Sequence, residues 1–166
     1  QRQRPRKAGK DAGVIGQRET GAGGVAVGFG VQVDANFAFA KALQHVAPDV
    51  DVLVTGDAAT IAGADRVVFP GVGAIRDCMG ELARRGLTGA IRQAADEKPL
   101  LAICIGMQAL MHSSEENGGT ACLGILPGRV RHFGTALQDA DGNTLKVPHM
   151  GWNQVHQEGH PLWTGI

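Results

Sequence analysis

The sequence contains no apolar run near the roughly 20 residues that a membrane-spanning helix needs, which argues against a membrane protein. Its start also lacks the basic and then apolar pattern of a secretory signal. Cysteine is scarce: Cys78, Cys104 and Cys122 are too scattered for a CxxC metal or redox site and too few for a disulfide framework. We therefore expect a cytoplasmic protein with free thiols and no membrane, metal or cofactor.

Net charge is absent overall, because 16 Lys and Arg balance 16 Asp and Glu. The distribution is uneven: residues 1–24 hold six basic and two acidic groups, which leaves the remainder negative by four. A basic segment can contact nucleic acid, but no aromatic residue is interleaved here for base stacking and no recognition motif follows. We expect residues 1–24 to form a disordered Gly-rich tail, residues 25–166 to form one domain, and nucleic acid not to be a partner.

From Gly24 onward, apolar strand-like runs alternate with amphipathic stretches, which predicts an α/β fold with a parallel sheet covered by helices. The expected strands are residues 25–27, 50–55, 67–69 and 100–104, and the expected helices are residues 37–46, 58–62, 75–84 and 88–96. Within the first helix, Phe37, Leu43 and Val46 are available for the inner face. Pro70 should close the third strand, because it cannot donate to a ladder, and Thr88 should cap the last helix.

Beyond residues 117–119 the pattern changes to short strand candidates at residues 128–133, 144–147 and 152–156, separated by turn residues such as those at 141–143. They predict a β-rich appendage beside the main sheet.

Residues 100–108 form an apolar strand that ends at Cys104, followed by a tight turn into a helix. This elbow presents the thiol at the carboxyl edge of the sheet, where the free amides and dipole of the new helix favour thiolate over thiol. A cysteine in an apolar strand is more often a small buried hydrophobe, as we expect for Cys78 beside Met79. Cys104 is nevertheless the candidate nucleophile, because two further segments can reach the same pocket. They are a glycine-rich loop at residues 70–73 and an acidic stretch at 113–116, which we expect to end the elbow helix.

Several ordered blocks surround this elbow. They are FPGVGA and DCM at residues 69–74 and 77–79, KPLLAICIGMQ at 98–108, SSEE at 113–116, LGILPGRV at 123–130 and KVPHMGWN at 146–153. Together the blocks resemble class I (triad) glutamine amidotransferases, and among these the glutaminase subunits of imidazole glycerol phosphate synthases of histidine biosynthesis. The resemblance implies a flavodoxin-like, mainly parallel sheet with helices on both faces and a β-rich appendage.

The resemblance also implies hydrolysis of the side-chain amide of glutamine. Cys104 would attack the carbonyl carbon, release ammonia and form a thioester that water hydrolyses to glutamate. The oxyanion would be met by the backbone N–H of Ile105 at the helix start, and by that of Val72 or Gly73 in the glycine loop.

By the same resemblance, Gly73, Gln108 and Glu116 line the glutamine site, and Glu116 pairs with the substrate ammonium. The alternatives are that Gln108 is a solvated helix residue and Glu116 a helix-end charge.

The last block carries the implied interface with the cyclase subunit, which is the heterodimer partner that receives the ammonia. Its residues are His149, Met150, Gly151, Trp152 and Asn153. Buried packing is the alternative for Trp152, because tryptophan is amphipathic and suits either setting.

The sequence departs from the family pattern at both ends. The family places its catalytic His, with Glu two residues later, beyond the position of Ile166, and His156-Gln157-Glu158 has that spacing but comes too early in the order. We therefore expect a C-terminally incomplete domain with little glutamine hydrolysis and an open, association-prone sheet edge. At the start, residues 28–36 replace the family's Asp-Tyr-Gly-x-Gly-Asn turn, and Ala102 replaces a usual glycine of the elbow.

Other functions remain open at this point. The scaffold without its base can serve as a non-catalytic module that docks a partner. An unrelated elbow-cysteine hydrolase or redox protein has no reason to contain the acidic and 146–153 blocks. A dinucleotide site is the weakest alternative, because Gly71-Val72-Gly73 lacks the third spaced glycine and the acidic residue about 20 positions on.

Overall fold

The computed structural model describes residues 24–27, 33–149 and 151–163. The chain divides into two compact units, residues 1–130 and 131–166, which are described separately here. All but the last residue of the predicted tail lies outside the described residues, and a single domain over residues 25–166 stays a prediction. None of the described helices combines the length and the apolar character needed to cross a membrane.

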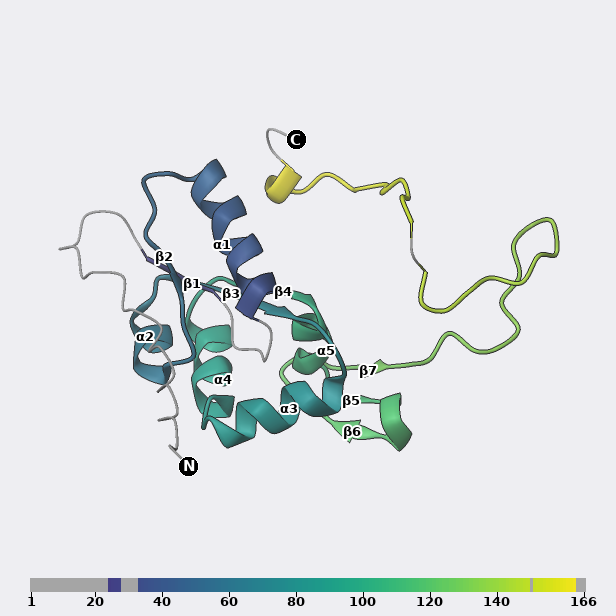
Figure 1. Cartoon of the computed structure of the whole chain (residues 1–166), viewed down its shortest axis with the longest axis horizontal. Helices are drawn as coiled ribbons and strands as arrows, with labels where there is room; N and C mark the ends of the chain where they lie inside the picture. The colour runs from purple at the N-terminus through teal and green to yellow at the C-terminus, as the bar shows by residue number, and fades with distance from the viewer. Residues whose placement is uncertain (1–23, 28–32, 150, 164–166) are drawn as a thin grey trace, which may run out of the picture. The chain divides into compact units, whose positions relative to one another are not determined.

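The first unit is built on a four-stranded sheet whose strands all run parallel. Its strands are β1 (Val25–Val27), β2 (Val52–Val54), β3 (Arg66–Gly71) and β4 (Leu100–Cys104), in the order β2-β1-β3-β4 (Figure 1). The predicted α/β class with a parallel sheet is therefore confirmed, and each strand was expected within a few residues of its position.

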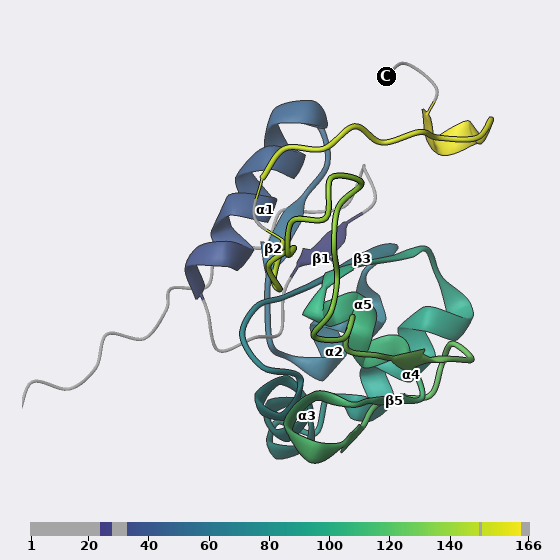
Figure 2. The same cartoon turned by 90° about the vertical axis from the view of Figure 1, so that its right-hand side faces the viewer.

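Helices cover both faces of this sheet. They are α1 (Val33–Val46), α2 (Ala58–Gly63), α3 (Ile75–Arg84), α4 (Thr88–Glu97) and α5 (Ile105–Leu110). Successive side chains of a strand point to opposite faces, so Val67 and Phe69 of β3 pack into a core with α2, α3, α4 and α5, whereas Val68 packs on the side of Phe39 and Leu43 of α1. Figures 1 and 2 show α1 on one side of the sheet and α2 and α4 on the other.

The inner face of α1 differs from the prediction. Phe37 and Val46 are 47% and 74% exposed, and only Leu43 of the predicted trio packs against the sheet. Phe39 and the buried Ala40 take the other inner positions. Small Ala40 allows the helix to approach the strands, so the face is centred between positions 39 and 43 rather than on Phe37.

Pro70 does not end its strand, contrary to prediction. It lies inside β3 and is in register with Ile103 of β4. The pairing of β3 with β1 has already ended at Val68 and Val27. At Pro70, β3 therefore has no β1 residue beside it that would accept a backbone N–H, and a proline is tolerated at such a position.

Thr88 is the first residue of α4 and not its cap. Gly86, with φ +68°, closes α3: its N–H donates to Ala83 at 3.1 Å, and the N–H of Leu87 donates to Leu82 at 2.9 Å. This is the Schellman arrangement. It delivers buried Leu87 directly to the cap position of α4, which has no side-chain cap.

A smaller three-stranded sheet follows α5, so a second sheet beside the main one is present, but only its strand at residues 129–130 falls within a predicted segment. Its strands are β5 (Ser113–Ser114), β6 (Thr120–Ala121) and β7 (Arg129–Val130), in the order β6-β5-β7, with the 3-10 turn η1 (Glu116–Gly118) between β5 and β6. The acidic stretch therefore does not end the elbow helix, because α5 already ends at Leu110.

The second unit contains little regular structure among its described residues. Of the predicted strand at 128–133 only β7 forms, and residues 144–147 and 152–156 contribute a single bridge, between Gln138 and Thr144. Asp139 accepts hydrogen bonds from the N–H groups of Asp141 and Asn143 and so holds the predicted turn, and η2 (Pro161–Trp163) follows. The remaining segments are exposed and lack the partner strands that stabilise isolated β-pairs.

β4 is an outer strand of the sheet within the described residues, and Leu101 on it is 56% exposed. Unpaired strand groups beside an apolar side chain favour pairing with a second copy. We therefore expect concentration-dependent association that Leu101→Lys shifts toward monomer in sedimentation experiments. Leu126→Lys, which changes an exposed leucine outside the sheet, should leave association unchanged. A wild-type chain that stays monomeric at every concentration tested would contradict this expectation.

Candidate functional site

Cys104 occupies a strained backbone position at the junction of β4 and α5. Its φ and ψ are +55° and −117°, outside the conformations that L-residues ordinarily adopt. The side chain is exposed and makes no capping hydrogen bond to the helix. The predicted strand-to-helix elbow is therefore present, and it presents a free thiol to solvent rather than burying it.

Two glycines allow this elbow to press against β3. A Cβ built on Gly106 would lie 1.9 Å from the carbonyl oxygen of Phe69, and one built on Gly71 would lie 2.7 Å from the N atom of Gly106. Backbone therefore approaches backbone at both positions, which only glycine permits. The sequence analysis did not assign this role, although the glycine two residues after Cys104 is the available signal.

The glycine loop lies at the same edge of the sheet as the thiol. Gly71 is in register with Cys104 on the neighbouring strand, and the loop continues through Val72 to Gly73, whose φ is +89°. Val72 and Gly73 are exposed, whereas Ile105 is buried in the first turn of α5. The structure thus brings the three residues predicted to form the oxyanion hole to the carboxyl ends of two adjacent strands.

Glu116 reaches this region from the turn η1. Its Oε2 accepts the N–H of Ile75 at 3.4 Å, two residues beyond Gly73. Gln108 is half-buried on α5, four residues after Cys104, and positions four apart share a helix face. The predicted glutamine-site residues therefore come from the loop after β3, from α5 and from η1, all within the first unit.

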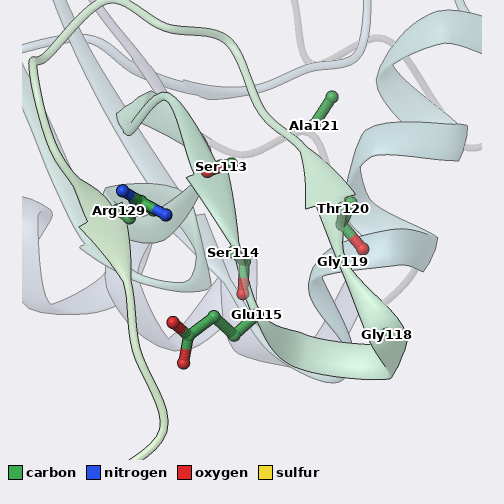
Figure 3. A pocket seen from close by; sticks show the side chains of 8 residues that line it. All are labelled: Ser113, Ser114, Glu115, Gly118, Gly119, Thr120, Ala121 and Arg129. Carbon is green, nitrogen blue, oxygen red and sulfur yellow. The ribbon is translucent and has the colours of Figure 1, made fainter.

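A hollow of about 430 Å³ lies on the small sheet. Figure 3 shows its lining residues, which come from the three short strands and the connecting turn: Ser113, Ser114, Glu115, Gly118, Gly119, Thr120, Ala121 and Arg129. Neither Cys104 nor Gly73 lines it. The hollow therefore does not include the candidate nucleophile, although Ser114 and Glu115, which line it, immediately precede Glu116.

The remaining thiols pack against the core, as predicted for Cys78; for Cys122 no position was predicted. Cys78 and Cys122 are half-buried and pack against the main core cluster. Burial, with a smaller contribution from neighbouring Cys122, raises the pKa of the Cys78 thiol to about 11. Burial also raises the pKa of Cys122. Both shifts disfavour the nucleophilic thiolate of these two residues. Cys104, in contrast, is the exposed thiol among the three.

Within the described part of the first unit, the histidines are His45 in the last turn of α1 and His112 after α5. The N–H of His112 donates to Gly128, and neither imidazole is hydrogen-bonded to the thiol of Cys104. His156 and Glu158 belong to the second unit. The expectation of little glutamine hydrolysis by this polypeptide stays a prediction.

The predicted interface residues lie in the second unit. Trp152 is fully exposed, so the alternative of buried packing is wrong for the described structure. The Nδ2 of Asn153 lies 3.1 Å from the Nε2 of His149, and Met150 lies outside the described residues. An exposed tryptophan beside a hydrogen-bonded pair of polar side chains is available to a partner.

An elbow cysteine beside a glycine loop on a parallel sheet is typical of a nucleophilic hydrolase, and a comparison with protein families specifies which one. The family described as Glutamine amidotransferase class-I matches residues 30–165, so the chain belongs to the class I glutamine amidotransferases.

Similar individual proteins carry the name imidazole glycerol phosphate synthase subunit HisH. The chain is 59% identical to that of Methylococcus capsulatus over 129 residues and 58% identical to that of Pseudomonas putida over 128 residues, which is 76% of this chain and 59% of each relative. It is 61% identical over 128 residues to that of Thiobacillus denitrificans, of which it covers 56%. The chain therefore spans less than two thirds of these relatives' length.

Proposed function

We propose that this chain is the glutaminase part of an imidazole glycerol phosphate synthase and that Cys104 is its nucleophile toward glutamine; that this polypeptide by itself hydrolyses little glutamine stays a prediction. The observation that carries the proposal is the strained, exposed Cys104 at the elbow, in register with the first glycine of the loop after β3. A backbone outlier that the fold maintains at a strand end is characteristic of a functional position. The identity to HisH proteins supports glutamine as the substrate.

In the proposed reaction the Cys104 sulfur attacks the side-chain carbonyl carbon of glutamine and the carbonyl electron pair moves to oxygen. The N–H of Ile105 and that of Val72 or Gly73 then donate to this oxyanion. The oxyanion electron pair then returns to carbon and the C–N bond breaks, while the nitrogen takes up the proton that the thiol has lost and leaves as ammonia. Water cleaves the resulting thioester to glutamate and the free thiol. Glu116 pairs with the substrate ammonium, and Gln108 lines the same site.

The ammonia would pass to a cyclase subunit that builds the imidazole ring. The exposed segment with His149, Gly151, Trp152 and Asn153 is the proposed contact, together with Met150 between them. Exposed tryptophan is enriched where proteins bind one another. We also propose a cytoplasmic location, where such a biosynthetic partner and free thiols coexist.

The test is covalent labelling with a chloroketone analogue of glutamine, which carries the amino-acid ammonium and an electrophile in place of the amide. We expect incorporation of one equivalent at Cys104, a rate that saturates with reagent concentration, and protection by glutamine. Cys104→Ala should abolish labelling, whereas Cys122→Ala should not change it.

Labelling that rises linearly with concentration, or that modifies Cys78 or Cys122 and spares Cys104, would contradict a glutamine site. That result would favour the non-catalytic docking module instead.

A further inference from the structure

Glu116 is held by hydrogen bonds on its backbone and on its carboxylate. Its N–H donates to the Oγ of Ser114 at 3.2 Å, and its carbonyl accepts from the N–H of Gly119 at 3.1 Å. On the carboxylate, Oε2 accepts the N–H of Ile75 at 3.4 Å and Oε1 lies 3.5 Å from the Nδ2 of Asn117. An exposed glutamate ordinarily samples many rotamers, so the two long carboxylate contacts favour the rotamer that faces α3, and the backbone bonds hold the turn that carries it.

Arg76 ties the same turn to the start of α3. Its Nη2 donates to the carbonyl oxygen of Asn117, 41 residues away. Ile75 and Arg76 are the first two residues of α3, so consecutive residues of the helix bond to Glu116 and Asn117, which are consecutive residues of η1. Asn117 adopts φ +56° and ψ +36°, a left-handed conformation that asparagine tolerates.

Ser114 supports the turn from the other side. It is only 3% exposed on β5, and a buried hydroxyl needs a partner. It accepts the N–H of Glu116, at the point where the chain leaves the strand for the turn. Arg76 and Ser114 therefore hold the two ends of the short segment that carries the Glu116 carboxylate.

We propose that Arg76 and Ser114 are positioning residues that fix Glu116 beside the glycine loop and so set the affinity for the ammonium of the substrate. This inference rests on the proposed function, in which Glu116 pairs with that ammonium. A carboxylate can accept the N–H of Ile75 and still accept from an ammonium, because its two oxygens offer about four acceptor sites. Neither Arg76 nor Ser114 needs to touch the substrate.

The first measurement separates affinity from reactivity. In Arg76→Met and Ser114→Ala we expect the half-saturating concentration of the glutamine chloroketone to rise about 5-fold, which corresponds to about 1 kcal/mol. The maximal labelling rate, and the rate with iodoacetamide, which carries no ammonium, should not change. Arg76→Lys, which keeps a cationic donor, should restore part of the affinity. The matched controls Arg92→Met on α4 and Ser113→Ala on β5 should behave as wild type.

The second measurement does not depend on glutamine. The N–H of Ile75 begins α3 and has no acceptor within the helix, so the hydrogen bond that slows its exchange is the one to Glu116. We expect exchange at Ile75 to accelerate about 10-fold in Arg76→Met, a change typical of losing one local hydrogen bond. Exchange at Leu82, inside the same helix, should remain at its wild-type rate.

Unchanged exchange at Ile75 in Arg76→Met would overturn the inference. So would a wild type whose labelling saturates together with variants that keep the wild-type half-saturating concentration of the chloroketone. If wild-type labelling does not saturate, the proposed function is overturned. In that case the exchange at Ile75 by itself confirms or overturns the positioning of Glu116.

Discussion

Gly106→Ala is expected to destabilise the first unit by at least about 3 kcal/mol, in the range of the most damaging single substitutions. The new Cβ would lie 1.9 Å from the carbonyl oxygen of Phe69 and 2.9 Å from its carbonyl carbon. Both atoms belong to the backbone of the inner strand β3, so relief of the clash requires movement of the strand or of α5. Either movement also displaces the elbow that carries Cys104.

Urea unfolding followed by circular dichroism measures this effect, and two other helical glycines provide controls. A Cβ on Gly80 of α3 or on Gly89 of α4 would meet nothing within 4 Å. Because alanine is the better helix former, Gly80→Ala and Gly89→Ala should each raise stability by about 0.5–1 kcal/mol. A Gly106→Ala protein with the wild-type unfolding midpoint would show that β3 and the elbow do not pack as tightly as this distance requires.

The main sheet could be predicted from sequence because its signals are local. Apolar runs separated by amphipathic stretches indicated β1 to β4, and Gly86 indicated the end of α3. Errors arose where a neighbour decides the outcome. Pro70 stays in its strand because β1 has already ended there, and Thr88 loses the cap position because α3 closes onto Leu87.

The elbow at Cys104 was predictable for the same reason, since an apolar strand followed directly by a helix is a short-range pattern. The contacts that organise its surroundings were not predictable. Glu116 and Ile75, and likewise Asn117 and Arg76, lie 41 residues apart and meet only through the packing of η1 against α3. Such pairs leave no periodicity in the sequence, so Arg76 carried no signal of its own, and Ser114 was noted only as a member of the block at 113–116.

In the second unit the sequence predicted strands that the described residues do not form. Short apolar segments at residues 144–147 and 152–156 satisfied the strand pattern, but among the described residues they lack neighbouring strands to complete a ladder. Strand propensity reflects packing on a pleated surface more than a backbone preference. A two-residue bridge between Gln138 and Thr144 is what remains of the prediction.

Cys78 should react with iodoacetamide about 100-fold more slowly in the native protein than in the urea-unfolded chain at pH 8, because the reaction rate follows the thiolate fraction. Burial raises the pKa of this thiol from 9.0 to about 11. At pH 8 the ionised fraction therefore falls from about 10% to about 0.1%. Mass spectrometry of the labelled peptides resolves Cys78 from the exposed Cys104, which should react first.

The same shift makes stability depend on pH in a defined direction. The unfolded thiol loses its proton near pH 9.0, whereas the folded thiol keeps it until about pH 11. Stability from this group is therefore fully present below pH 9 and is lost as the pH rises to 11, by roughly 2–3 kcal/mol if the shift acts alone. Cys78→Ala removes the group, so the difference in unfolding free energy between wild type and variant should shrink over this interval. A difference that stays constant from pH 8 to pH 11 would mean that Cys78 ionises equally readily in the folded and the unfolded chain. The Cys78 side chain would then have to be more accessible to water than its contacts with the core indicate.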